Sequence, residues 1–352
     1  PNMSTYTTSA RMNDISLMRV FCIFSVVAFH VYQMTWCMPG QEGRFGSEIG
    51  NICYNLYYVP IDNVLINIGM PLFTVISGYL FFWQISIGKL TSWRQVLVKK
   101  AKRILIPYIA FSIPFMATTG VFFKTHIWIA FINGSYWHLW FLPTIMLSFI
   151  IGYATRKWMG NIATCFLLIA IFATLRFTHH LWLPEDFPIT KVTSLTKWYV
   201  WFAVGGGILH LKAYFKPLQS LCIDYLFLIG GGAYISLLPL EYGNNDPLNN
   251  IAIALALIGI FSILNRFNFD WVGKSKALAL IDRCSMGTYI FHFWVAVFLV
   301  SSTARNLFNL DHLLLTHPII FPFCFFLSTF AVSLFLTWLL QQTRAGRYIL
   351  GQ

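Results

Sequence analysis

Long apolar segments recur along this chain, and each is close to the length of a membrane-crossing helix. The first, from Ser16 to Trp36, is almost wholly apolar apart from Arg19, His30 and Gln33. About 20 such residues suffice to cross the hydrocarbon core of a bilayer. Across the chain 57% of residues are hydrophobic and only 10% are charged, whereas a soluble protein has about 25% charged residues. We therefore predict an all-α membrane protein.

The apolar segments divide the chain into one membrane unit with short loops. We predict about ten spans, near 15–36, 60–83, 104–123, 137–155, 160–178, 197–211, 219–240, 250–267, 284–302 and 318–341. Most lysines and arginines fall in loops on the same side as the N-terminus, so both termini are predicted to be cytoplasmic.

The predicted layout is an N-terminal tail over 1–13, a membrane domain over 14–343 and a C-terminal tail over 344–352. Because Pro1 and Asn2 precede Met3, we interpret these two residues as a cloning remnant. We expect no cleavable signal peptide, since the first span can serve as its own insertion signal.

Arg19 and His30 are ionisable groups inside the first span, eleven positions apart. At 3.6 residues per turn and 1.5 Å per residue, they share one helix face and lie about 16 Å apart. A guanidinium binds phosphate well, and an imidazole is the usual general base at neutral pH. Cations inside a span usually face a cavity or a partner. The alternative is structural: Arg19 reaches lipid headgroups, and His30 hydrogen-bonds to another helix.

A dense group of cations precedes the third span, namely Lys99, Lys100, Lys102 and Arg103. In the predicted topology these cations lie on the cytoplasmic side, toward which Arg19 also lies. Such groups commonly fix topology and contact anionic lipid. The alternative interpretation is a clamp for a phosphorylated ligand at the inner end of the bundle.

Two later spans carry polar residues that packing alone does not require. His138 stands between two tryptophans at the outer interface, where an aromatic belt explains the tryptophans but not the histidine. Ser285, Tyr289 and His292 are spaced by four and three residues, so they share one face of the ninth span. His292 falls near the middle of the membrane in this arrangement.

The second span is also unusually polar. It carries Asp62, Asn63 and Asn67 near one end, followed by Gly69 and Gly78. The glycines permit kinks and close helix contacts. Internal satisfaction of these polar groups explains them at least as well as ligand contact does.

The cysteine pattern and the net charge exclude two other classes of site. Seven cysteines show neither C-x-x-C nor a Cys/His metal spacing, so no metal site is predicted. Most lie in apolar segments and are expected to be buried small hydrophobes, while Cys37 and Cys53 flank one outer loop and can pair. The formal charge of +12 lies mainly in loops between spans, so no nucleic-acid partner is expected.

Taken in order, these motifs resemble the acyltransferase-3 family of membrane acyltransferases over about 14–343. They are R-x10-H in the first span, PLFTVISGYL in the second, KKAKRILIP before the third, HLWFL from His138, and SMGTYIFH from Ser285 to His292. The family's usual R-x-x-R is here Lys100 and Arg103, and lysine offers a point charge instead of a planar fork. The hydrolase-like domain of larger relatives is absent from this sequence, so we expect the membrane domain to complete transfer alone.

The resemblance implies transfer of an acyl group, typically acetyl from acetyl-CoA, to a hydroxyl of a cell-envelope glycan or its lipid-linked precursor. It also implies a bacterial cytoplasmic membrane, with membrane lipids as the other partner. Two alternatives stay open: an exporter of glycan precursors without chemistry, and an enzyme with a succinyl donor or a peptidoglycan or lipid acceptor.

We expect the cations at 99–103 to hold the acyl-CoA phosphates, with Arg19 contacting the donor, and His30 to take the proton of the acceptor hydroxyl. His30 then needs an orienting partner, for which Asp62 and Asn67 are candidates. Tyr289 and Ser285 are candidate donors to the developing oxyanion, and His138 and His292 belong to the same acceptor region. Direct transfer and an acyl-histidine intermediate are both open.

Overall fold

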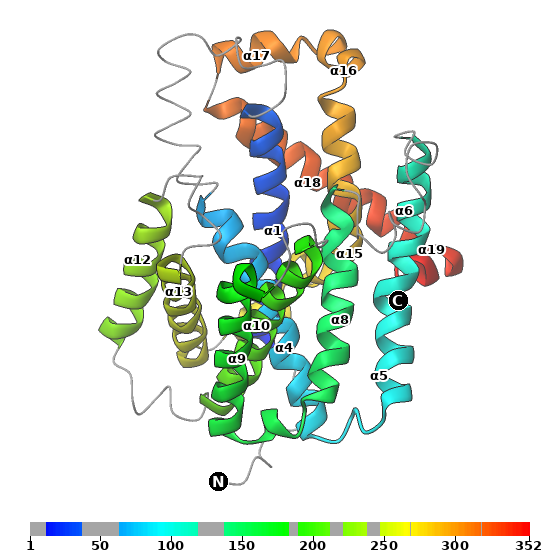
Figure 1. Cartoon of the computed structure of the whole chain (residues 1–352). Helices are drawn as coiled ribbons and strands as arrows, with labels where there is room; N and C mark the ends of the chain where they lie inside the picture. Colours follow the sequence, from blue (N-terminus) through cyan, green and yellow to red (C-terminus); the bar gives the residue numbers. More distant parts are fainter. Residues whose placement is uncertain are drawn as a thin grey trace.

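The computed structural model describes residues 12–36, 63–118, 137–182, 189–211, 221–237, 247–267, 269–317 and 319–352. Every regular element within these ranges is helical, and they contain no strand. Figure 1 shows one bundle, with α1 (Asn13–Trp36) near its centre. The all-α prediction is therefore confirmed for the described part of the chain. Cys37, Cys53 and Asp62, named above as candidates, lie outside it.

Within the described ranges, the α-helices are interrupted by two π-helical and two 3-10 segments. The first half contains η2 (Leu65–Gly69), α4 (Met70–Ser86), α5 (Trp93–Lys100), η3 (Ala101–Leu105), α6 (Ile106–Thr118), η5 (Trp137–Trp140) and α8 (Phe141–Ala154). The second half contains η6 (Trp158–Gly160), α9 (Ile162–Trp182), α10 (Ile189–Leu211), α12 (Leu221–Leu237), α13 (Pro247–Arg266), α14 (Asp270–Lys274), α15 (Lys276–Leu299), α16 (Ser302–Leu307), α17 (Leu310–Thr316), α18 (Ile320–Gln341) and α19 (Arg344–Ile349).

Three helices in the described part are long and apolar enough to cross a membrane: Asn13–Tyr32, Asn63–Ser86 and Ile320–Gln341. They coincide with the first, second and tenth predicted spans. Shorter apolar helices at His138–Ala154, Ile162–Thr178, Tyr225–Ile235 and Leu248–Leu264 overlap four more of the predicted spans. The chain is thus a helical membrane protein, while the number of ten spans and the sides of the termini stay predictions.

α1 and α15 lie against each other and run in the same direction. Arg19 meets Asp282 at one end of the contact, and His30 meets His292 at the other. α15 begins before the predicted span at 284–302, because Ser275 caps it by accepting a hydrogen bond from the Leu278 backbone amide. The longer helix brings Asp282 into the contact.

A close crossing of α4 and α10 supports the opposite side of the bundle. A Cβ atom on Gly78 would lie 1.9 Å from the Phe202 carbonyl oxygen, and one on Gly205 would lie 2.2 Å from that of Val75. Only glycine allows the two backbones to approach this closely, as is common between membrane helices. The expected close contact at Gly78 is confirmed.

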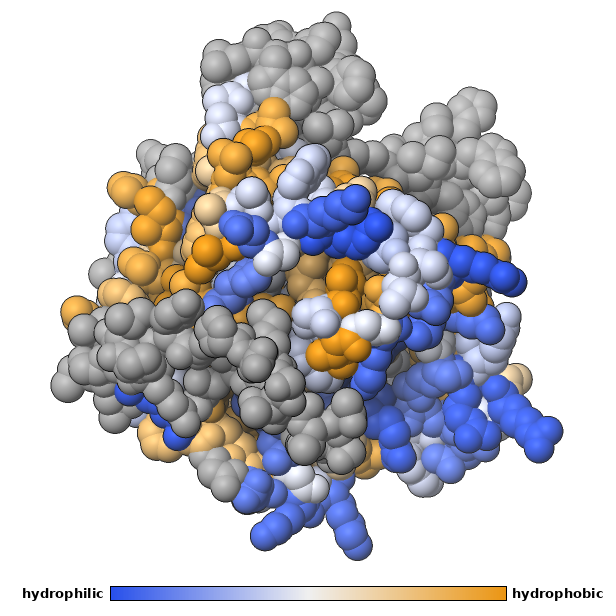
Figure 2. Space-filling view, turned by 90° about the horizontal axis from the view of Figure 1, so that it is seen from below, coloured by the Kyte–Doolittle hydropathy of each residue, from blue (hydrophilic) through white to orange (hydrophobic). Residues whose placement is uncertain are grey.

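The cations at 99–103 lie where one long helix changes its winding. α5 continues through the π-helical η3 into α6, and Lys102 and Arg103 belong to η3. π-helical turns are rare and occur often at functional sites. Figure 2 views the molecule from below, where hydrophilic side chains gather.

Candidate functional site

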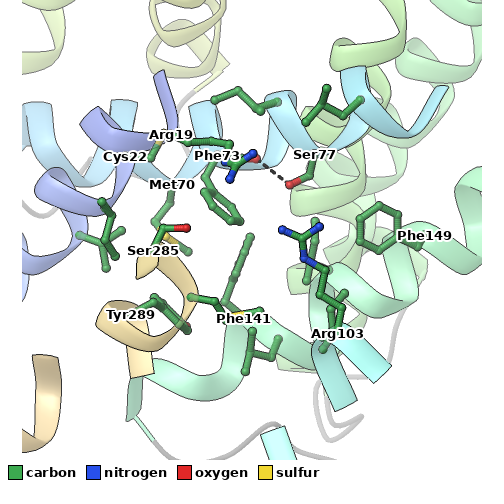
Figure 3. A pocket seen from close by; sticks show the side chains of 18 of the residues that line it. Arg19, Cys22, Met70, Phe73, Ser77, Arg103, Phe141, Phe149, Ser285 and Tyr289 are labelled. Carbon is green, nitrogen blue, oxygen red and sulfur yellow. Dashed lines mark hydrogen bonds between the residues drawn. The ribbon is translucent and has the colours of Figure 1, made fainter. Parts of the chain in front are cut away.

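A cavity of about 150 Å³ opens between α1, α4, α8, α15 and the continuous α5–α6 helix. A single water needs only about 10–15 Å³ of such volume, so the cavity can admit a ligand chain. Most of its wall is apolar, and its polar lining residues are Arg19, Ser77, Gln84, Lys100, Arg103, Ser285 and Tyr289. Figure 3 shows the guanidinium groups of Arg19 and Arg103 directed into the cavity from different helices.

The four predicted phosphate-binding cations divide into two pairs. Lys100 and Arg103 line the cavity, as expected from their relation to Arg19. Lys99 and Lys102 lie outside its lining; both are exposed, as is Arg103, so position relative to the cavity and not exposure separates the pairs. Within the described part of the chain, Arg103 makes no hydrogen bond or ion pair, so its positive charge is available to an anion in the cavity.

Lys100 lies over aromatic rings rather than beside a carboxylate. Its Nζ is 4.1 Å from the ring centroid of Phe149 and 5.6 Å from that of Phe81. Such contacts stabilise a cation through the ring quadrupole. Burial, together with the charges of Arg103 and Lys99, lowers the pKa of Lys100 to about 8. The positive charge of this lysine therefore depends on pH in the mildly alkaline range.

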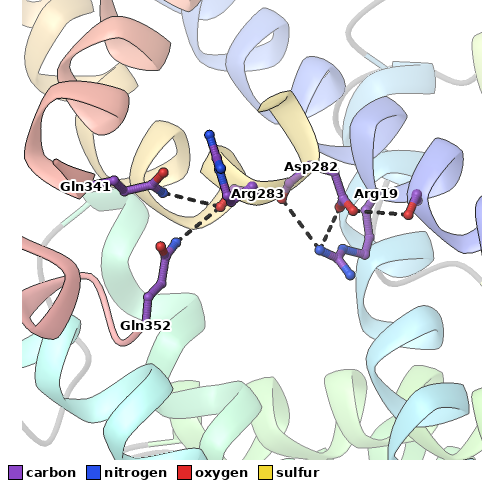
Figure 4. Close-up of polar contacts among 6 residues, drawn as sticks. Arg19, Asp282, Arg283, Gln341 and Gln352 are labelled. Carbon is purple, nitrogen blue, oxygen red and sulfur yellow. Dashed lines mark hydrogen bonds and ion pairs between the residues drawn. The ribbon is translucent and has the colours of Figure 1, made fainter. Parts of the chain in front are cut away.

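Arg19 is paired with Asp282 of α15 by an ion pair, with 2.6 Å between Nη2 and Oδ1. The other carboxylate oxygen of Asp282 accepts a hydrogen bond from Ser16 Oγ at 3.0 Å (Figure 4). The side chains are 25% and 11% exposed, so the pair is partly shielded from water and faces the cavity from one side. Arg19 thus contacts both a neighbouring helix and the cavity.

None of the motifs named in the sequence analysis contains Asp282. One signal was present in the sequence: a lone aspartate next to Arg283, at the inner end of an apolar segment. A carboxylate at that depth needs a counter-charge. Arg19, at the inner end of the first span, is a cation at a similar membrane depth.

His30 has two partners at Nδ1, the Val26 carbonyl oxygen at 2.9 Å and Nε2 of His292 at 3.2 Å. Asn67, a predicted orienting residue, instead donates to the Asn63 carbonyl oxygen and accepts from Asn249. Asn67 is therefore not the orienting partner: η2 does lie against α1, but the Asn67 side chain bonds within its own helix and to α13.

The hydrogen-bond partners fix which nitrogen of each ring carries a proton. Carbonyl oxygens only accept, so the bond to Val26 places a proton on Nδ1 of His30. His292 Nδ1 likewise donates to the Tyr289 carbonyl oxygen at 2.6 Å, which leaves His292 Nε2 as the acceptor from His30. In the neutral state His30 therefore presents an unprotonated Nε2, the atom that a general base needs.

His138 is close to the other two imidazoles. Its ring centroid is 5.2 Å from that of His292 and 6.4 Å from that of His30. Its Nε2 donates to the Ile290 carbonyl oxygen at 3.0 Å, and its own carbonyl oxygen accepts from the Tyr289 hydroxyl. The fold thus brings together three histidines predicted from separate spans, and we call His30, His138 and His292 the histidine cluster.

Accessibility separates the members of the histidine cluster. His138 is 2% exposed and His292 is fully buried, whereas His30 is only partly buried. None of the three lines the cavity, although Val26 and Tyr289, which contact them, both do. Of the three, His30 is therefore best placed to meet a substrate.

The predicted oxyanion donors differ in availability. Ser285 and Tyr289 both line the cavity from α15, in agreement with their shared helix face. The Tyr289 hydroxyl already donates to His138, so it has to give up that bond before donating to a substrate. Ser285 has no such partner within the described residues.

Within the described residues, no group of three or more His, Cys, Asp or Glu side chains is arranged to hold a metal ion. The histidine cluster is held instead by carbonyl oxygens and by one imidazole–imidazole bond. Cys22, Cys165 and Cys284 are buried, as expected for small hydrophobes, and Cys324 is exposed.

Comparison with known protein families gives one match. A family model described as an acyltransferase domain (Acyl_transf_3) matches residues 12–338, nearly the whole chain. No curated protein and no solved structure matches the chain.

Proposed function

The chain belongs to the acyltransferase-3 family, and on that premise we propose that it transfers an acetyl or other short acyl group from acyl-CoA to a hydroxyl. The proposed acceptor is a cell-surface polysaccharide or its lipid-linked precursor, and the proposed location is a bacterial inner membrane. One observation carries the proposal: the cation-bearing cavity is lined by Val26, and the carbonyl oxygen of Val26 contacts Nδ1 of His30, which supports Nε2 as the base nitrogen.

The donor half of the proposal rests on charge. The phosphates of acyl-CoA are anionic, and Arg103 and Lys100 bring two cations to the cavity, neither of which is ion-paired within the described residues. The apolar wall suits the uncharged pantetheine arm. Arg19 lines the same cavity but is held by Asp282, so we assign it to positioning the donor rather than to neutralising its full charge.

The chemical step needs one base and one path for the proton. The acceptor hydroxyl attacks the thioester carbonyl carbon, and its proton passes to Nε2 of His30. The carbon–sulfur bond then breaks, and the departing CoA thiolate takes the proton from His30. His292 keeps His30 in the required tautomer by accepting from Nδ1. Since His30 does not line the cavity, the thioester has to pass beyond Val26 and Tyr289 to reach it.

The experiment is donor turnover by the purified protein in detergent or nanodiscs. Release of free CoA thiol is measured with acetyl-CoA, succinyl-CoA and a longer acyl-CoA, and envelope glycans are compared by mass spectrometry with and without the protein. We expect CoA release that depends on His30 and a mass increase of one acyl group on a glycan. If the wild-type protein bound no acyl-CoA, the proposal would be wrong and an exporter of glycan precursors would be favoured.

A further inference from the structure

The last residues of the chain form a fixed turn. After α19, the Gly351 amide donates to the Tyr348 carbonyl oxygen at 3.0 Å and the Gln352 amide to that of Arg347 at 2.9 Å. These two bonds, with Gly351 at φ +70°, make a Schellman motif, in which glycine takes the left-handed position at the end of a helix. Leu350 is 1% exposed, so the turn is anchored in the protein.

One side of this turn rests on the cationic wall of the cavity. A Cβ atom on Gly351 would lie 2.6 Å from the carbonyl oxygen of Arg103 and 2.7 Å from its Cα. The two backbones are therefore in direct contact. Arg103 lies in a π-helical turn, and such turns are rarer than α-helical ones. The contact with Gly351 therefore helps to fix the position of the Arg103 Cα atom, from which its side chain extends.

The other side of the turn reaches the pair that holds Arg19. The Gln352 side chain donates to the Arg283 carbonyl oxygen at 3.1 Å, and Gln341 of α18 donates to the same oxygen at 3.4 Å. Arg283 directly follows Asp282, the partner of Arg19. Figure 4 shows Gln341 and Gln352 meeting at the Arg283 carbonyl oxygen, next to the separate contacts between Asp282 and Arg19.

We infer that the turn Leu350–Gln352 is a positioning element for the acyl donor: it sets the separation of Arg103 and Arg19 across the mouth of the cavity. This inference rests on the proposed function, because it takes the ligand of the two guanidinium groups to be the phosphorylated donor. The turn is not part of the cavity lining and meets the backbones of Arg103 and Arg283 instead, so we expect its effect on donor binding and not on the chemical step.

The test compares two glycines with nearly the same backbone conformation. Gly351 has φ +70° and meets Arg103, whereas Gly88 has φ +72° and has nothing within 4 Å of a built Cβ. Both alanine variants thus carry the cost of a non-glycine residue at positive φ, but only Gly351→Ala places a Cβ atom against the Arg103 backbone. The measurements are KM for acetyl-CoA, kcat, and the dissociation constant of acetyl-CoA, all on monodisperse protein.

We expect Gly351→Ala to raise KM and the dissociation constant by about ten- to 10²-fold, which corresponds to the loss of one charge-assisted hydrogen bond to the donor. We expect kcat to stay within about twofold, and Gly88→Ala to match wild type. Equal effects in the two variants, or a fall in kcat with unchanged KM, would overturn the inference.

A second variant keeps the test open if Gly351→Ala fails to fold. Gln352→Ala removes only one of the two side-chain donors to the Arg283 carbonyl oxygen, so we expect a smaller rise in KM of about threefold. Wild-type KM in Gln352→Ala would count against the inference. Failure of the proposed function has a different signature, since wild type and all three variants would then lack acyl-CoA binding.

Discussion

The contact between α1 and α15 contains two polar pairs of different chemical kinds. At one end Arg19 and Asp282 form an ion pair beside the cavity, and at the other His30 and His292 share a hydrogen bond. The first pair joins a guanidinium to a carboxylate, whereas the second joins two imidazoles whose tautomers are set by their hydrogen bonds. One pair of parallel helices thus supplies a site suited to a charged ligand and a site suited to moving a proton, separated by about three helical turns.

The difference follows from access to water. Arg19 is 25% exposed, so its charge is partly solvated and tolerates the cost of burial. His292 is fully buried, where an uncompensated charge is expensive. Two imidazoles can share a hydrogen bond only when one nitrogen lacks a proton, so neutral rings satisfy each other without any net charge.

The largest effect is expected from removing the accessible imidazole. His30→Ala should lower acyl transfer by about 10²–10⁴-fold, because general base catalysis contributes that much, while expression and the melting temperature stay close to wild type. CoA release by purified protein measures this. The exposed His312 of α17 gives the control His312→Ala, and more than about a tenth of the wild-type rate in His30→Ala would exclude this residue as the base.

The ion pair comes next. Asp282→Asn keeps the size of the side chain but leaves Arg19 without its carboxylate, and we expect donor turnover to fall by roughly ten- to 100-fold, since one charge-assisted bond is worth about 1.5–3 kcal/mol. Asp270→Asn, at an exposed aspartate, is the matched control. Equal turnover in the two variants would show that Arg19 does not need Asp282.

His292 should matter less than His30. His292→Ala removes one of two acceptors from His30 Nδ1, but the Val26 carbonyl oxygen remains, so we expect kcat to fall about tenfold, below the full general-base effect. His292→Gln offers an amide oxygen as acceptor and should recover most of that loss. A glutamine variant as slow as the alanine variant would argue against tautomer control.

The smallest effect concerns pH at the cavity. With a pKa of about 8, Lys100 loses its proton as pH rises through 8, so affinity for the anionic donor should fall by about two- to fivefold between pH 7 and 9, as for a partly screened charge pair. Binding measured across this range should flatten in Lys100→Arg, because arginine stays protonated. Lys99→Arg, at an exposed lysine, should keep the wild-type slope.

Local sequence patterns predicted what lies on each helix. The spacing of Arg19 and His30 gave their shared face, and the spacing of Ser285 and Tyr289 gave theirs, because helical periodicity is a local property. The partners of His30 are not local. Both α15 and η2 adjoin α1, so whether His30 meets His292 or Asn67 depends on the depth and rotation of each helix, and apolar helices in lipid carry little local information about these.

Which of the four cations at 99–103 line the cavity also depends on tertiary structure. All four side chains are long and cationic, and the run KKAKR does not indicate which two line the cavity. The π-helical winding at Ala101–Leu105 and the aromatic rings of Phe81 and Phe149 decide it. Those rings belong to α4 and α8, so tertiary structure was required.

The parallel pairing of α1 with α15 also sets an order of events during synthesis. Arg19 and Asp282 are separated by 263 residues, so at 5–20 residues per second roughly 13–53 s elapse between their emergence from the ribosome. Throughout that interval the first span holds an arginine whose counter-ion does not yet exist. An incomplete chain therefore lacks both polar pairs until α15 has been inserted.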